Sequence, residues 1–242
     1  MGNAITWFEL VGPEPEETAD FYSDLFGWHT EEAERGYILI DTHSGSGMNG
    51  GIVAPPPKGT SGSIIYVQGP DVQAMLDRAV SLGAEMRMPV TEMAMVTFAL
   101  FTDPWGNRIG LMQGDGDAPV SAGDNPSVDW IEIGCAEPEK AFDFYRDLFG
   151  WTMETDMSGE AGGPIHASFS TGAGGGARGG IGSSRDGEPH VDVYAHVDDV
   201  AKYLEMAEGL DATIVMPAMK VDDETEIGLF TDPQGGTFGL YS

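Results

Sequence analysis

The chain has 242 residues, and its 40 acidic against 11 basic side chains give it a formal net charge of −29. Apolar residues at 41% and aromatic residues at 10% suffice for a buried core, which excludes a wholly disordered acidic chain. The negative field repels phosphate backbones and anionic lipids, so we expect neither nucleic acid nor a membrane surface as a partner.

Targeting and redox signals are sparse in the sequence. No apolar run approaches the roughly 18 residues that a membrane-spanning helix needs, and the first residues lack the basic and then apolar pattern of a signal peptide. Cys135 is the single cysteine, so no intrachain disulfide and no thiolate metal cluster can form. We therefore expect a cytoplasmic protein.

The acidity has two interpretations. Acidic residues are spread along the whole chain and only four lysines occur, which is typical of a surface adapted to high salt. A binding face for a cationic ligand is the alternative. The even spread of the acidic residues favours the first interpretation.

The spacing of apolar residues, with Gly and Pro at the ends of segments, predicts the helices and strands of the first half. Residues 5–11 alternate and are followed by Gly12-Pro13, which indicates a strand. Pro15 then opens a helix that Gly27 ends. The further first-half elements are strands near 28–31, 37–42 and 51–54, a strand over 63–68, a helix over 71–82, and strands near 84–88, 96–102 and 108–112.

The second half repeats the first. Residues 7–28 and 130–151 align without a gap at an offset of 123 (130 − 7), and both end in F-Y-x-x-L-F-G-W. A later match of L-F-T-D-P, at 100–104 and 229–233, has an offset of 129, so the second half carries extra residues, most simply around 158–164. The order strand-helix-strand-strand-strand thus occurs twice in each half, with a helix over 199–208 in the second. We predict domains at 1–113 and 128–242, joined by a linker over 114–127.

Four such units, with the F-Y-x-x-L-F-G-W helix end and a late D-P-x-G turn, resemble the vicinal oxygen chelate superfamily, which includes glyoxalase I, bleomycin resistance proteins and extradiol dioxygenases. The resemblance implies an α+β fold of tandem glyoxalase-like domains. Each domain would be two βαβββ units that form a cup-shaped mixed sheet with the helices outside and the ligand on the concave face. Since the fusion corresponds to the homodimers of that superfamily, we expect a monomer or a homodimer.

Catalytic members of the superfamily hold a divalent metal through a His or Gln on the first strand, a His or Glu on the fifth and a Glu on the eighth. The resemblance places these positions at Trp7, Ile64 and Gly110 in the first half and at Trp130, Asp192 and Gly239 in the second. Only Asp192 carries a donor that could replace a water ligand of a metal ion. We therefore predict that the metal-dependent chemistry is lost and that no cofactor is bound, with a divalent metal at a relocated site as the alternative.

Strand alternation predicts which side chains line the two cups. The glycines at 110 and 239 should leave room opposite each tryptophan, which suits a planar or apolar ligand. Alternatively, each tryptophan fills the emptied metal pocket as core. The predicted ligand-binding residues are Trp7, Glu9, Tyr66, Arg108, Trp130, Glu132, His190, Asp192, Tyr194 and Tyr241.

Glu132 and His190 are the candidate catalytic residues. Glu9 and Glu132 occupy the same position in the two halves, and a carboxylate desolvated against a tryptophan can accept a proton. Alternatively, these glutamates only pair with an arginine such as Arg108. His190 opens a strand whose polar side chains share one face, so with Glu132 it could form an acid–base pair near neutral pH.

The predicted function is therefore metal-independent binding of a small, partly aromatic or cationic molecule, by a protein that resembles the bleomycin resistance and hydroxylase-like branch. The alternative is a lyase, isomerase or dioxygenase-type enzyme that uses Glu132 and His190 or a relocated divalent metal. A third possibility, action through the surface alone, would require a large exposed apolar patch, and the sequence indicates none.

The interpretation of the acidity can be tested by adding salt. If the surface is adapted to high salt, the melting temperature should rise in about 2 M salt, where the Debye length is below roughly 3 Å and local ion pairs are already screened. Differential scanning calorimetry across a salt series measures the change. An unchanged melting temperature would rule out the halophilic interpretation.

Overall fold

The computed structural model describes residues 2–56, 59–94, 96–114, 120–155, 165–172 and 177–242. The extra residues of the second half, expected around 158–164, lie outside this described part, as does a portion of the predicted linker. Within the described ranges, no helix is long and apolar enough to cross a membrane.

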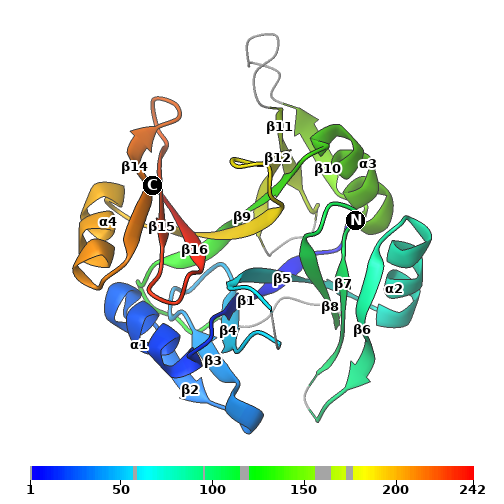
Figure 1. Ribbon diagram of the computed structural model, residues 1–242, viewed down its shortest axis with the longest axis horizontal. Coiled ribbons are helices and arrows are strands. Elements are labelled where there is room, and N and C mark those ends of the chain that lie inside the picture. The colour runs from blue at the N-terminus through cyan, green and yellow to red at the C-terminus, as the bar shows by residue number, and fades with distance from the viewer. Residues whose placement is uncertain (1, 57–58, 95, 115–119, 156–164, 173–176) are drawn as a thin grey trace. The chain divides into compact units, whose positions relative to one another are not determined.

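The secondary structure follows the predicted order in both halves (Figure 1). The first half contains β1 (Ile5–Val11), α1 (Pro15–Phe26), β2 (His29–Glu32), the short 3-10 helix η1 (Glu34–Gly36), β3 (Ile38–Asp41), β4 (Asn49–Val53), β5 (Gly62–Gly69), α2 (Val72–Ser81), β6 (Glu85–Glu92), β7 (Thr97–Thr102) and β8 (Arg108–Gln113). The second half contains β9 (Ser127–Cys135), α3 (Pro138–Phe149), β10 (Thr152–Thr155), β11 (His166–Ser170), β12 (Arg178–Ser183), β13 (His190–His196), α4 (Val200–Gly209), β14 (Thr213–Lys220), β15 (Glu226–Thr231) and β16 (Thr237–Tyr241).

These strands form two eight-stranded mixed sheets with equivalent orders. The first sheet has the order β2-β3-β4-β1-β5-β8-β7-β6, and the second has β10-β11-β12-β9-β13-β16-β15-β14. β1 pairs with β4 in parallel, and β5 with β8, whereas β7 and β8 run antiparallel. The prediction of an α+β fold with tandem βαβββ domains is confirmed.

Local sequence explains where the helices begin and end. α1 and α3 each start on a proline, whose missing N–H is not needed in the first turn. Both end at a glycine in the left-handed conformation, Gly27 at φ 72° and Gly150 at φ 71°. α2 and α4 are instead capped by aspartates, since Asp71 accepts a hydrogen bond from the Ala74 amide and Asp199 from the Lys202 amide.

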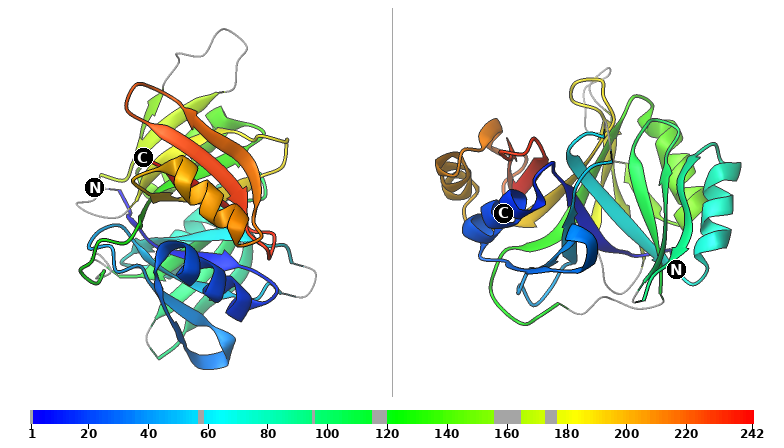
Figure 2. Two further views of the ribbon diagram at one scale, coloured as in Figure 1. Left: turned by 90° about the vertical axis from the view of Figure 1, so that its left-hand side faces the viewer. Right: turned by 60° about the horizontal axis from the view of Figure 1, so that its bottom comes forward.

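The described chain forms two compact units, and each draws one strand-helix-strand-strand-strand motif from each half. Unit 1 comprises Met1–Thr6, Ile64–Asp117 and Ile131–Val191, and unit 2 comprises Trp7–Ser63, Ala118–Trp130 and Asp192–Ser242. Within unit 1, α2 contacts α3, and within unit 2, α1 contacts α4 (Figures 1 and 2). The domain boundaries expected from the repeat stay a prediction.

A buried hydrogen bond between the two repeated motifs holds each unit together. In unit 2, the Tyr22 hydroxyl of α1 donates to Asp232 Oδ2 at 3.0 Å, and in unit 1 the Tyr145 hydroxyl of α3 donates to Asp103 Oδ2 at 2.7 Å. Both tyrosines come from the F-Y motif, and both aspartates from the D-P turn of the opposite half. Burial, together with the neighbouring carboxylate, raises the pKa of both tyrosine hydroxyls well above the ordinary range, so both remain donors.

The same aspartates also close their own turns. Asp103 Oδ1 accepts the amides of Trp105, Gly106 and Asn107 at 2.8–3.0 Å. Asp232 Oδ1 likewise accepts amides of its turn, at 2.8 and 2.9 Å. Each carboxylate therefore fixes its turn through Oδ1 and a helix through Oδ2, and Asp103 Oδ2 also accepts the side-chain amide of Asn107 at 3.0 Å.

Removal of either tyrosine hydroxyl should destabilise the protein. Tyr22→Phe and Tyr145→Phe each remove one donor from a buried carboxylate, and we expect a loss of about 1.5–3 kcal/mol in the free energy of unfolding. In Tyr145→Phe, Asp103 Oδ2 keeps the Asn107 Nδ2 donor at 3.0 Å. Urea denaturation measures this loss. Tyr203→Phe on α4 is the matched control, because it removes a half-buried hydroxyl that makes no hydrogen bond in the described part of the chain. Equal losses in all three variants would contradict this account.

Candidate functional site

A chain of three hydrogen-bonding groups starts on β1 in unit 2. The Trp7 indole Nε1 donates to the Tyr37 hydroxyl at 3.1 Å, and that hydroxyl donates to Glu9 Oε1 at 3.0 Å. Glu9 is only 8% exposed. Burial first, and then the charge of Glu9, raise the pKa of Tyr37 far above its ordinary range, so the hydroxyl stays protonated. The predicted residues Trp7 and Glu9 are thus joined through a tyrosine that the prediction did not include.

An equivalent carboxylate on β9 has a different partner, in unit 1. His166 Nε2, at the start of β11, lies 3.1 Å from Glu132 Oε2 and 3.4 Å from Oε1. The side chains are 43% exposed for His166 and 20% for Glu132, so solvent reaches this pair. The candidate catalytic residue Glu132 therefore has an imidazole neighbour, but it is one that the prediction did not name.

A glycine underlies each of these pairs. A Cβ at Gly51 on β4 would overlap the Tyr37 hydroxyl, and a Cβ at Gly180 on β12 would overlap both His166 and Glu132. Tyr37 and His166 are 129 positions apart, as are the two glycines. This is the offset of the L-F-T-D-P match, so an alignment at that offset gives Tyr37 and His166 equivalent positions, as it does the two glycines.

His190, the other candidate catalytic residue, lies beside β9 in unit 1. The His190 ring lies over Gly134, where a Cβ would overlap it, and its Nδ1 lies 3.2 Å from the carbonyl oxygen of Glu188. Gly134 follows Glu132 by two positions, so both face the same side of β9. The acid–base pair of Glu132 and His190 stays a prediction.

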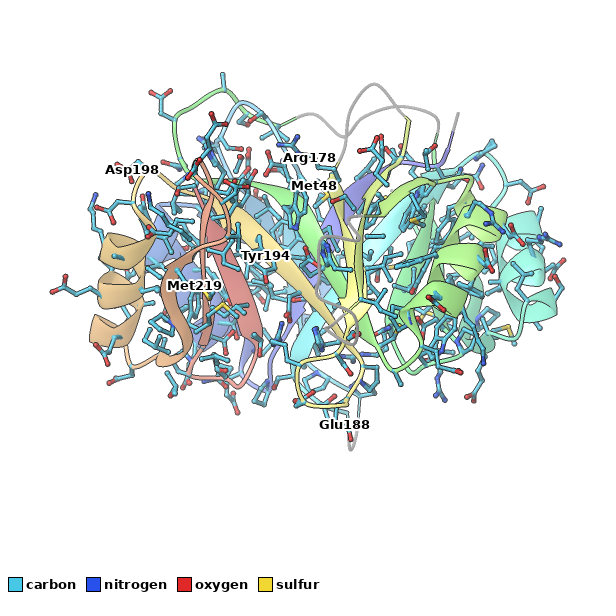
Figure 3. The ribbon with its side chains drawn as sticks, turned by 90° about the horizontal axis from the view of Figure 1, so that it is seen from above. Met48, Arg178, Glu188, Tyr194, Asp198 and Met219 are labelled. Carbon is cyan, nitrogen blue, oxygen red and sulfur yellow. The ribbon has the colours of Figure 1, made fainter. Side chains whose placement is uncertain are left out.

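The prediction that Gly110 and Gly239 leave open room is wrong. The Tyr66 ring covers Gly110, its register partner on β8. The Tyr194 ring covers Gly239, its register partner on β16; Tyr194 is labelled in Figure 3. Both tyrosines are buried. A glycine beside a large neighbour offers its backbone as a packing surface, and here an aromatic ring of the adjacent strand occupies it.

The other predicted lining residues lie on the expected strands. In unit 2, the Trp130 ring lies 6.4 Å from that of Tyr241, whose hydroxyl donates to Asp129 Oδ1 at 2.5 Å. Asp192 is buried on β13, and Arg108 is half-buried at the start of β8 in unit 1.

The side chains at the six positions that correspond to metal ligands in the vicinal oxygen chelate superfamily do not form a metal site. Five of the six carry indole, isoleucine or glycine, which offer no donor side chain to a divalent cation, and tyrosine rings cover both glycines. Asp192 alone carries a carboxylate. Among the described residues, no group of three or more His, Cys, Asp or Glu side chains could hold a metal.

Comparison with known proteins gives a consistent assignment. A sequence model described as "Glyoxalase/Bleomycin resistance protein/Dioxygenase superfamily" matches residues 4–111 and 127–240. The protein "Putative glyoxylase CFP32" of Mycobacterium tuberculosis is 24% identical over 256 residues, which cover 97% of this chain and 92% of that protein. "Anthracycline biosynthesis protein DnrV" of Streptomyces peucetius is 30% identical over 170 residues, which cover 61% of this chain and 60% of that protein. Among solved structures, the Mn(II)-bound glyoxalase from Novosphingobium aromaticivorans superposes with a TM-score of 0.70 at 13% identity, over 100% of this chain and 82% of the other.

Proposed function

Because the chain belongs to the glyoxalase/bleomycin resistance protein/dioxygenase superfamily, we propose that it is a metal-independent member that binds a small, planar molecule. The observation that carries this proposal is the aromatic ring over a glycine in both halves. Tyr66 over Gly110 and Tyr194 over Gly239 occupy the places where a carboxylate ligand would stand in a metal-binding member. Uncharged rings at these positions favour a site without a metal ion.

The tryptophans supply the stacking surfaces. Trp7 is held in one orientation by Tyr37, since its indole N–H is already used in that hydrogen bond. A ring fixed in this way loses little freedom when a flat ligand packs on it, which favours affinity. The similarity to a protein named for anthracycline biosynthesis supports an aromatic ligand as the class to test first.

An acid–base enzyme is the second candidate function, because Glu132 lies within hydrogen-bonding distance of the His166 imidazole. Carboxylate and imidazole together can take up and return a proton without a metal.

Metal content distinguishes this proposal from a metal-dependent member. After dialysis against Mn(II) or Zn(II) and then against metal-free buffer, elemental analysis should find far less than one ion per chain, because five of the six superfamily positions lack a donor side chain. A parallel sample of a metal-dependent glyoxalase controls for losses during dialysis. One tightly held ion per chain would show that the metal-independent assignment is wrong.

The stacking role of the tryptophans can be tested with 4-nitrophenol, a small planar probe. Trp7→Ala and Trp130→Ala should each weaken binding at the affected site by roughly tenfold or more, since each removes an aromatic stacking partner. Equilibrium dialysis of the full chain measures the dissociation constants. Trp105→Ala is the matched control, because Trp105 lies on the β7–β8 turn and packs on Phe144 instead. Absence of binding by the wild type, or unchanged binding in both variants, would refute the proposed function.

A further inference from the structure

The two repeated halves carry the same carboxylate with different partners. Glu9 accepts a hydrogen bond from a phenol, whereas Glu132 lies beside an imidazole. Each partner rests on the glycine of the fourth strand of its motif, Gly51 or Gly180. The backbone arrangement is thus retained, and the chemistry differs at one side chain.

The first of these pairs is fixed in one protonation state. Tyr37 both accepts from Trp7 and donates to Glu9, and burial keeps its hydroxyl protonated. A proton transferred to or from this hydroxyl would leave an uncompensated charge in a buried place. The Glu9–Tyr37 pair can therefore orient a ligand but cannot exchange a proton with it near neutral pH.

The second pair has the opposite properties. An ionised carboxylate only accepts hydrogen bonds, so the short contact assigns the proton of a neutral His166 ring to Nε2, toward Glu132. Nδ1 is then the basic nitrogen of the ring. With 43% of its side chain exposed, His166 is within reach of a ligand.

We propose that His166 is a proton acceptor for a bound ligand and that Glu132 is its positioning residue; this inference rests on the proposed small-molecule binding. The ligand's O–H bond breaks, its proton passes to Nδ1 of His166, and the electron pair stays on the ligand oxygen. The resulting imidazolium keeps its Nε2 proton toward Glu132, whose charge stabilises the positive ring. The complex gains no net charge, and no oxidant, metal or second reactant is needed.

The charge of the chain favours a neutral hydroxylated molecule as the ligand of the pair. A neutral phenol avoids the repulsion that a chain of net charge −29 exerts on an anion before binding. It also carries the O–H bond whose proton His166 accepts in this proposal.

The experiment uses 4-nitrophenol with the full chain, at a pH below the pKa of the free phenol. The phenolate has its own absorption band, so the ionised fraction of bound probe is read directly, and equilibrium dialysis gives the bound amount separately. Wild type should show the phenolate band on binding. His166→Tyr recreates the Glu9–Tyr37 arrangement over Gly180, and it should bind the probe with a band weaker by roughly tenfold or more.

Two further substitutions make the result specific. His166→Asn serves if the tyrosine variant fails to fold, and Glu132→Gln should also reduce the ionised fraction, since the imidazolium loses its stabilising charge. His43→Asn is the control: His43 Nε2 lies 3.3 Å from Asp41 Oδ2 in another exposed histidine–carboxylate pair, and its loss should leave the band unchanged.

The outcomes separate the two proposals. Binding without a phenolate band, or a band that survives in both His166 variants, overturns the inference and leaves the proposed function intact. Absence of binding by the wild type overturns both.

Discussion

The hydrogen bond from a buried tyrosine to a buried aspartate is the interaction on which each unit depends. Burying a carboxylate away from water costs free energy unless hydrogen-bond donors surround it. Asp103 and Asp232 accept hydrogen bonds from the amides of their own turns and from one tyrosine hydroxyl each. The F-Y and D-P motifs are therefore two parts of one contact, and each part is supplied by a different half of the chain.

Glycines on the strands determine where large side chains can lie against the sheets. At Gly51 and Gly180 the missing side chain admits a phenol or an imidazole beside a glutamate. At Gly110 and Gly239 it admits the ring of a tyrosine on the paired strand. At each of these four glycines the ring of another residue thus lies against the backbone.

Much of the fold could be predicted because local signals agree with the final structure. Pro15, Gly27 and Asp71 mark helix ends within a residue or two of those observed, and the repeat indicates the order of the strands. The hydrogen-bond partners of Glu9 and Glu132 could not be predicted from such local signals. Tyr37 and His166 contact glutamates 28 and 34 positions away, across strands whose register the sequence does not state. The drift of the repeat offset from 123 to 129 also hides their equivalence.

The two tyrosine–aspartate hydrogen bonds span different lengths of chain, so they can form at different times during translation. Tyr145 and Asp103 are 42 residues apart, so the contact of unit 1 becomes available while the second half is still being translated. Tyr22 and Asp232 are 210 residues apart, and α1 therefore has no carboxylate partner until the final turn has left the ribosome. Because distant contacts close slowly, the earliest helix to be made belongs to the unit that is completed last.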